Sequence, residues 1–286
     1  MQPPLRFFHI LLCAVCLAGR RKLGMAVLYT KENYNSGPGQ MDTQTILISF
    51  SAFFIASFLK GLTGLGFSTL CLGILAVFID IKLAIPLVFL PSLSSNIMVM
   101  VVAGRFFESL KRFWLLFLSA LPGLFLGIWF LGNSQNEAPK VLLGLVMLLY
   151  GIWGLKNGLF ELSKRRERQL TIPVGLLSGL INGATGSQIM PIMPYLLSLK
   201  MDRDLFVQTI NCSFTINSLL MMICLGKIGL ISLPVIYVSS VGIVPVAVGI
   251  FLGGILRKKV TEWVYRKLVL ILLICLGASL LIRPFL

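Results

Sequence analysis

The sequence predicts an all-α integral membrane protein. Three observations support this prediction: the composition, the length of the apolar runs and the placement of the charges. The chain has 286 residues, of which 57% are hydrophobic and 12% charged, and its mean hydropathy is +0.94. Soluble domains carry about a quarter charged residues. Several apolar runs reach the roughly 20 residues that cross a bilayer as a helix, and the alternating pattern of an outer-membrane barrel is absent. We therefore expect a multi-pass protein of the cell (inner) membrane, with the lipid bilayer around it.

The net charge of +15 does not indicate a nucleic-acid partner, because the basic residues fall mainly in short connections between apolar runs. The excess is concentrated in three connections, 104–112, 156–169 and 257–267. The connections at 80–82, 133–139 and 226–229 have almost no such excess. The positive-inside rule therefore places the three basic connections in the cytoplasm.

The apolar segments follow one another from residue 41 onward. They are 44–80, 83–103, 113–132, 140–158, 171–199, 204–226, 229–256 and 262–282. With the basic connections in the cytoplasm, segment 171–199 begins and ends on the cytoplasmic side, yet it is too short for two crossings of about 20 residues each. We expect a helical hairpin bent at INGATGSQ, residues 181–188. Segment 44–80 would bend likewise at KGLTGLG, residues 60–66, and enter from outside; a single crossing as a broken helix would remove this inversion.

The two halves of the chain also resemble each other in sequence. LKGLTG at 59–64 aligns with INGATG at 181–186, 122 positions later. Weaker matches follow in the same order: Asn96 with Asn217 or Ser218, Gly104 with Gly226, and Pro122 and Gly127 with Pro245 and Gly249. Inverted repeats with broken helices are a recurrent plan of transporters. We therefore predict two inverted repeats, 41–160 and 161–286, each a glycine-broken hairpin plus three transmembrane helices.

The first 40 residues have a doubtful status and are expected to lie outside this fold. Their apolar run, 7–19, is short for a span and is followed at once by basic residues, which is a poor signal peptide. One hypothesis is that translation starts at Met25 or Met41 rather than Met1. The run contains the protein's single histidine, His9, and a CxxC at Cys13 and Cys16. Without a second cysteine pair, this indicates neither a metal site nor a cofactor.

Two glycine-rich signatures and one polar run carry a family resemblance. They are GLTGLGFSTL at 61–70, GLINGATGSQIMPIMPYLLSL at 179–199 and LFVQTINCSFTINSLLMM at 205–222. On these motifs the chain resembles the TauE/SafE sulfite-exporter family of membrane permeases over 44–286. The family's usual GxGGG cluster is not present as such, since Phe67 follows Gly66 and Ser187 follows Gly186. The resemblance implies transport of small organic or sulfur-containing anions such as sulfite and sulfonates.

Lys60 is the main candidate for binding such an anion. An ionisable residue deep in a membrane segment is costly unless it is paired or hydrated. All acidic residues fall at segment ends or in connections, so a bound anion would supply the missing charge. Alternatively, Lys60 extends to the interface from a shallow hairpin.

The glycines of both hairpins also have two interpretations. They allow close helix packing, or they break the helices and free backbone N–H groups for an anion. Polar side chains beside them would add neutral donors, and Asn96 and Asn217 occupy matching positions in apolar helices. The predicted substrate site comprises Lys60, Gly61, Thr63, Gly64, Gly66, Asn96, Asn182, Gly183, Thr185, Gly186, Ser187, Gln188 and Asn217.

The expected function is a secondary transporter or facilitator of small anions, working by alternating access at two opposed hairpins, with export as the expected direction. The chain has no GxxxxGK[ST] motif for ATP-driven transport. An anion channel and a non-transporting structural membrane protein are the alternatives. An intramembrane enzyme fits least, because His9 and the loop carboxylates provide no acid/base constellation. The sequence does not specify the oligomeric state.

Overall fold

The computed structural model describes residues 41–64, 66–135, 137–156, 161–257 and 262–283, with side chains of the last range described from 266. The N-terminal extension 1–40, including His9, Cys13 and Cys16, lies outside the described residues. Asp42–Leu286 fold as one compact unit.

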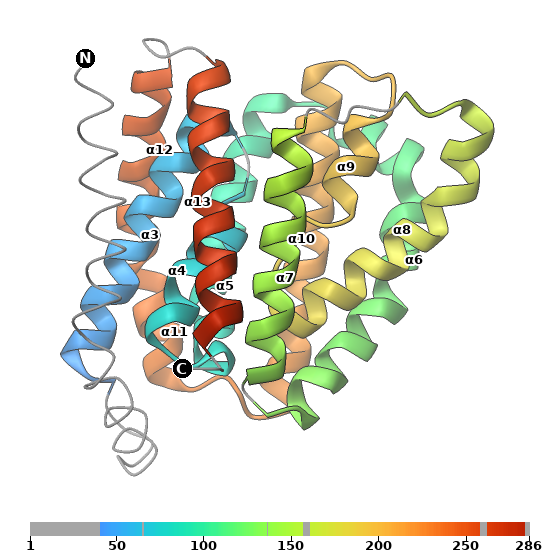
Figure 1. The fold of residues 1–286 in the computed structure, drawn as a ribbon. Coiled ribbons are helices and arrows are strands. Elements are labelled where there is room, and N and C mark those ends of the chain that lie inside the picture. Colours follow the sequence, from blue (N-terminus) through green and yellow to red (C-terminus); the bar gives the residue numbers. More distant parts are fainter. Residues whose placement is uncertain (1–40, 65, 136, 157–160, 258–261, 284–286) are drawn as a thin grey trace. The chain divides into compact units, whose positions relative to one another are not determined.

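The described residues are helical and contain no strand, which confirms the predicted all-α class (Figure 1). The helices are α3 (Thr43–Thr63), α4 (Phe67–Phe78), α5 (Ile81–Ala103), α6 (Phe106–Asn133), α7 (Glu137–Leu155), α8 (Lys164–Thr185), α9 (Ile192–Leu197), α10 (Arg203–Lys227), α11 (Leu233–Val241), α12 (Ile243–Arg257) and α13 (Glu262–Ile282). Six described segments are long and apolar enough to cross a membrane, namely α3, α5, α6, α7, α10 and the stretch from α11 through α12.

Side-chain caps set where several of these helices begin. The Asp80 carboxylate accepts from the Lys82 backbone N–H at the start of α5, and the Asp202 carboxylate accepts from Leu205 N–H at the start of α10. These caps satisfy N–H groups that have no partner inside the helix. The acidic residues therefore remain at helix ends rather than in the apolar interiors.

Three of the described helices end at glycines that take a left-handed backbone conformation, namely α5 at Gly104 and the two that end inside the glycine-rich stretches. Gly64 has a φ of 83° and donates its N–H to the Lys60 carbonyl at the end of α3. Gly186 has a φ of 72° and donates to the Asn182 carbonyl at the end of α8. Such a cap favours glycine because a Cβ is unfavourable there. Both breaks fall inside the glycine-rich stretches that the sequence predicts to interrupt the helices.

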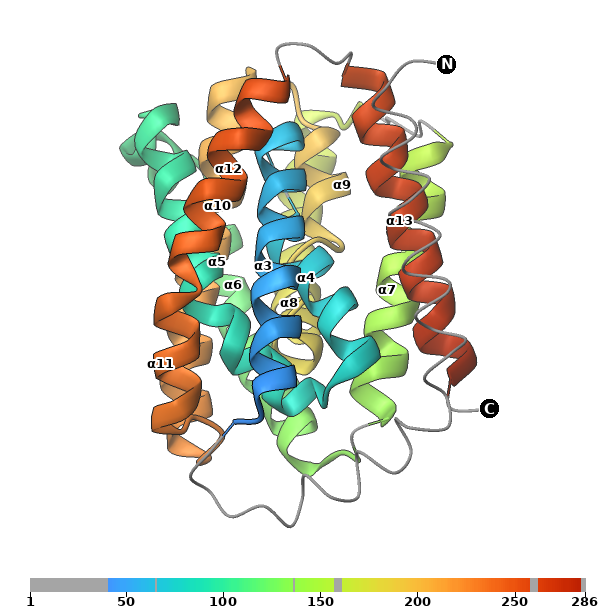
Figure 2. The same cartoon turned by 90° about the vertical axis from the view of Figure 1, so that its left-hand side faces the viewer.

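The chain reverses direction at each break. In Figure 2, α3 rises from the lower end and α4 runs back toward it. In Figure 1, α8 descends from the upper end, and the chain returns to α9 in the upper half. The two limbs of the first reversal are unequal, since α3 has 21 residues and α4 only 12. The α3 limb is by itself long enough to cross the bilayer.

The helix ends that flank the three basic connections lie at one end of this unit, the upper end in Figures 1 and 2. They are the junction of α5 with α6, the end of α7 with the start of α8, and the end of α12 with the start of α13. The positive-inside rule assigns this end to the cytoplasm. The opposite end holds the starts of α3, α5 and α7.

Close helix contacts join the two halves of the chain. Helix α3 packs along α12, while α8 packs along α6. A Cβ on Gly253 would lie 2.9 Å from the Gly61 Cα, and one on Gly127 would lie 2.8 Å from the Gly183 Cα. The sequence paired Gly127 with Gly249, but the contacts make Gly253 its counterpart, four residues or about one helical turn further on. A fixed offset fails here because the connection between α10 and α11, residues 228–232, is longer than the one between α5 and α6, residues 104–105.

Candidate anion site

The Lys60 side chain is held inside the protein by neutral oxygen atoms. Its Nζ donates to Asn96 Oδ1 at 2.6 Å, to Ser95 Oγ at 3.1 Å and to Asn211 Oδ1 at 3.4 Å. Lys60 is only 2% exposed. Within the described residues no carboxylate forms an ion pair with it. The site therefore holds a buried cationic side chain without a protein counter-charge.

Several buried polar atoms on α5 and α10, the two helices that bind Lys60, have no hydrogen-bond partner. Asn96 is 1% exposed, and its Nδ2 is unpartnered although its Oδ1 binds Lys60. Both amide atoms of Gln208, one turn before Asn211 on α10, are also buried and unpartnered. A buried donor without an acceptor costs about 1–3 kcal/mol. The Asn96 Nδ2 is thus a second donor, on the residue that holds Lys60, for an acceptor that the protein does not provide.

Lys60 lines a cavity of about 1200 Å³. The break glycines Gly64 and Gly66 contribute to its wall, together with apolar side chains from α5, α9 and α13. The cavity reaches the end that carries the basic connections, where it is lined by the first residue of α10, Arg203, and the last residue of α12, Arg257.

Cationic side chains predominate over anionic ones in this cavity. Arg203, Arg257 and Arg266 lie on three different helices, and Asp204 is the single carboxylate among the described lining residues. Within the described residues these arginines form no ion pair. A concave surface of one charge sign raises the local concentration of ions of the opposite sign. Positive charge therefore predominates among the described residues that line the cavity.

An ion-pair cluster stands beside the cavity, at the cytoplasmic end. Arg105 at the start of α6 binds Asp202 at 2.5 Å and Glu108 at 2.6 Å. The Leu205 backbone N–H and then the Arg105 guanidinium hold the pKa of Asp202 below its usual value, and these carboxylates raise the pKa of Arg105. The cluster connects the α5–α6 junction with the start of α10, where Arg203 and Asp204 line the cavity.

The two glycine-broken stretches are in direct contact. Thr69 Oγ1 in the first turn of α4 and Ser187 Oγ, just after α8, are 3.0 Å apart. The hydroxyls of Thr63 and Thr185 instead donate to carbonyls one turn earlier in their own helices. Thr185 Oγ1 also accepts from the Ser187 N–H, so it stabilises the break rather than facing a cavity.

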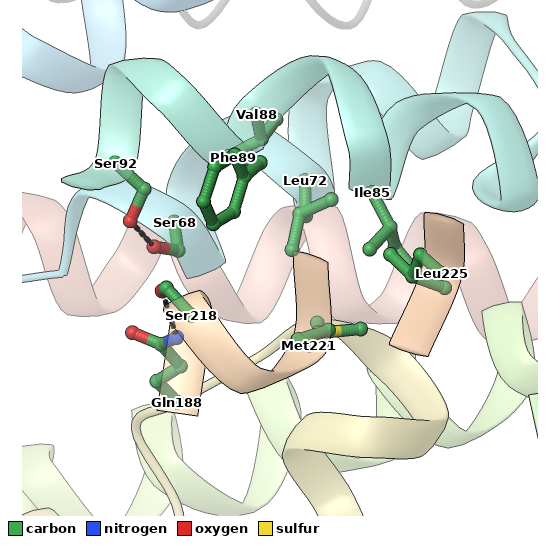
Figure 3. A pocket seen from close by; sticks show the side chains of 11 residues that line it. Ser68, Leu72, Ile85, Val88, Phe89, Ser92, Gln188, Ser218, Met221 and Leu225 are labelled. Carbon is green, nitrogen blue, oxygen red and sulfur yellow. Dashed lines mark hydrogen bonds between the residues drawn. The ribbon is translucent and has the colours of Figure 1, made fainter. Parts of the chain in front are cut away.

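A second, much smaller cavity of about 20 Å³ lies among α4, α5, α10 and the stretch after α8 (Figure 3). At one side, Gln188 Nε2 donates to Ser218 Oγ at 2.8 Å, and the Ser68 and Ser92 hydroxyls are 2.5 Å apart. Apolar side chains close its other side, and they are Leu72, Ile85, Val88, Phe89, Met221 and Leu225. These residues lie toward the ends of α5 and α10 opposite the basic connections, so the path to that end is narrow.

The predicted site residues divide between different places. Lys60, Gly61, Thr63, Gly64 and Gly66 line the large cavity, whereas Gly186 and Gln188 line the small one. Asn96, Asn182, Gly183, Thr185, Ser187 and Asn217 line neither cavity, although Asn96 binds Lys60, which lines the large one. Gly183 contacts α6, and Gly61 contacts α12 as well as lining the cavity. The packing interpretation thus describes Gly61 and Gly183, whereas Gly64, Gly66 and Gly186 lie at helix breaks. The N–H groups of Gly64 and Gly186 donate to helix carbonyls and so are not free for an anion.

Several residues around the site were absent from the predicted set. Ser95 and Asn211 bind Lys60, and Arg203, Arg257 and Arg266 line the cavity mouth. Ser95 lies next to the predicted Asn96, and Asn211 lies in a polar run within an apolar helix, so their composition was a usable signal. No group of metal-ligating side chains occurs among the residues that the structure describes.

The six described segments long and apolar enough to cross a bilayer define a multi-pass helical membrane protein, in which the buried Lys60 lines a cavity. Residues 49–280 match the model of the family described as sulfite exporter TauE/SafE, and the chain belongs to that family. This is a family of membrane transporters and not of enzymes. No curated protein and no solved structure matches the chain.

Proposed function

We propose that the protein exports small sulfur-containing or organic anions, such as sulfite or sulfonates, across the cell (inner) membrane by alternating access. The observation that carries this proposal is the Lys60 ammonium, buried among neutral oxygens in the wall of a cavity open to the cytoplasmic end. Burying an ion without a partner is costly, and an anion from the cavity would remove that cost. The unpartnered Asn96 Nδ2 offers a second donor to it.

An oxyanion suits these donors better than a halide does. Sulfite and sulfonate groups present several oxygens to separate N–H donors, and charge-assisted hydrogen bonds to such oxygens are about twice as strong as neutral ones. Arginine side chains at the mouth also match planar or bidentate oxygen pairs. The cavity is large enough for a hydrated anion of this size to approach Lys60.

The exchange of helix partners supports alternating access. The first helix of each half, α3 or α8, packs on the corresponding helix of the other half, α12 or α6, while α5 packs on α10 and α7 on α13. Two copies related by a twofold axis in the membrane plane would have these pairings. Exchanging the conformations of the two halves would close the cytoplasmic cavity and open the opposite side. The apolar cluster around the 20 Å³ cavity is our candidate for the seal that then opens.

Flux of sulfite and of a small alkylsulfonate into and out of proteoliposomes tests this function. Lys60→Gln is expected to reduce saturable flux at least tenfold, because the neutral amide cannot balance the anion. Lys227→Gln is the matched control, since Lys227 is exposed in the last turn of α10. Equal flux in wild-type and Lys60→Gln protein, with both folded, would contradict the proposed role of Lys60.

The same vesicles separate a carrier from an anion channel, the second candidate. A carrier that alternates shows accelerated exchange when unlabelled anion is present on the far side. A channel shows no such acceleration and follows the electrochemical gradient at each instant. A structural membrane protein without cargo would show no specific flux of any tested anion.

A further inference from the structure

We propose that Lys60 itself carries a proton with the anion: it binds substrate as an ammonium and, when the carrier is empty, releases that proton to water in the cavity. This inference rests on the proposed anion transport and adds the coupling ion to it. The proton moves from Nζ to a cavity water, leaving a neutral amine and hydronium, and the reverse step restores the ammonium. No further reactant is needed.

The hydrogen bonds of Lys60 suit both protonation states. The ammonium has three N–H donors, and three neutral acceptors receive them. The neutral amine has two N–H donors and a lone pair, so it needs one donor in return. Asn96 has that donor, its buried and unpartnered Nδ2, and a half-turn of its amide would bring Nδ2 to the place where Oδ1 now accepts at 2.6 Å. Asn96 can therefore satisfy either form.

Among the titratable groups that line the cavity with Lys60, none is a better candidate to bind and release the coupled proton. The cavity receives Arg203 and Asp204 from α10, Arg257 from α12, Arg266 from α13 and the Tyr150 phenol from α7. Helices α4 and α10 also carry the buried thiols Cys71 and Cys212, and α5 contributes only apolar side chains to the described lining. Arginine does not lose its proton in proteins. Asp204 is the remaining carboxylate of the lining, and it is not a hydrogen-bond partner of Lys60.

Proton release and anion binding are linked because each removes the same uncompensated charge. The anion favours the ammonium, and by reciprocity the proton favours anion binding. The loaded site then holds an ammonium with a monovalent anion, and the empty site holds an amine, so neither form moves net charge through the bilayer. Transport of a monovalent anion becomes electroneutral and follows the pH difference rather than the membrane potential.

The decisive probe is a small alkylsulfonate, which stays a monovalent anion at neutral pH, so that any coupled proton must be on the protein. Proteoliposomes with a potential clamped by potassium and valinomycin are given either a pH difference or a voltage. We expect the sulfonate to accumulate about tenfold per pH unit in the more alkaline compartment. A pH-sensitive dye inside the vesicles should report one proton moved per anion. An uncoupled anion would instead distribute tenfold per ~59 mV.

Two variants test which residue carries the coupled proton. Lys60→Arg keeps the charge but cannot release its proton, so sulfonate accumulation driven by pH should disappear; Asp204→Asn should retain it. Sulfonate flux that follows voltage and ignores pH in the wild type would overturn the coupling while leaving anion transport standing. Loss of pH-driven accumulation in Asp204→Asn alone would also overturn it, because the proton would then reside on Asp204. Absence of sulfonate and sulfite flux under every gradient would overturn the proposed function itself.

Discussion

Asn96→Ala tests how the protein holds a buried ammonium. Asn96 Oδ1 is the nearest acceptor of Lys60 at 2.6 Å, whereas Ser95 Oγ is 3.1 Å away and Asn211 Oδ1 3.4 Å away. A hydrogen bond to a charged group contributes about 1.5–3 kcal/mol. The 3.4 Å contact lies beyond the usual N–H···O range, so its loss should matter least. At a pH low enough to keep Lys60 protonated without substrate, we expect destabilisation of the protein in the order Asn96→Ala, Ser95→Ala, Asn211→Ala.

Thermal unfolding in detergent measures this order, with and without added sulfite. Asn96→Ala should lower stability by about 1.5–3 kcal/mol, and added sulfite should recover more stability than it gives the wild type, because the anion replaces the missing acceptor. Ser94→Ala is the control in the same helix, since its hydroxyl binds only the Pro91 carbonyl one turn earlier. Two outcomes would refute a charged Lys60 held by these acceptors. One is an equal loss of stability in Ser94→Ala and Asn96→Ala, and the other is a stabilisation of Asn96→Ala by sulfite no larger than that of the wild type.

Two further predictions concern helix packing and the cavity mouth. Gly127→Ala and Gly253→Ala should each destabilise the protein by about 1–3 kcal/mol, because a Cβ would lie 2.2 Å from the Leu180 carbonyl oxygen or from the Phe58 carbonyl oxygen. Gly132→Ala on α6 is the control and should leave the stability unchanged in the same thermal assay, because its Cβ would lie no nearer than 3.9 Å to another atom. If only one of Gly127→Ala and Gly253→Ala destabilised the protein, equivalent packing of the two glycines would be refuted. Arg203→Gln, Arg257→Gln and Arg266→Gln should each raise the KM of sulfite efflux several-fold at low salt with little change in kcat, since exposed charges steer association and are screened by salt. Arg165→Gln, on an exposed position at the same end, is the control, and an unchanged KM in all three cavity variants would remove the proposed steering.

The helical segments and their breaks could be predicted from sequence because their causes are local. Apolar length requires a span in a bilayer, and Gly64 and Gly186 take backbone conformations that other residues avoid. Both glycines were identified because the same local pattern occurs twice. The limits of the bent segments followed less well, because α8 begins at Lys164, inside the predicted basic connection, rather than at residue 171.

Asn96 was predicted as a site residue, but the pairing of Lys60 with its three partners could not be predicted, because its causes are not local. Asn211 is 151 residues away along the chain, and only the packing of α10 on α5 brings it to Lys60. The same holds for Gly253, which reaches Gly61 in a register shifted by the longer connection between α10 and α11. Charge and composition indicated a Lys60 side chain deep in the membrane segment, and it is buried, but they did not indicate which neutral oxygens it binds.

The contrast between Lys60 and Asn182 explains how a repeated backbone can yield a directional site. Each residue accepts the N–H of the break glycine four positions later, Gly64 or Gly186, so the two stand at equivalent points of their hairpins. The Lys60 side chain has three partners and lines the open cavity, whereas both amide atoms of Asn182 are buried without a partner. Unpartnered buried amides favour any state that hydrates them. In the proposed opposite state, hydration of Asn182 would therefore offset part of the cost of closing the cytoplasmic cavity.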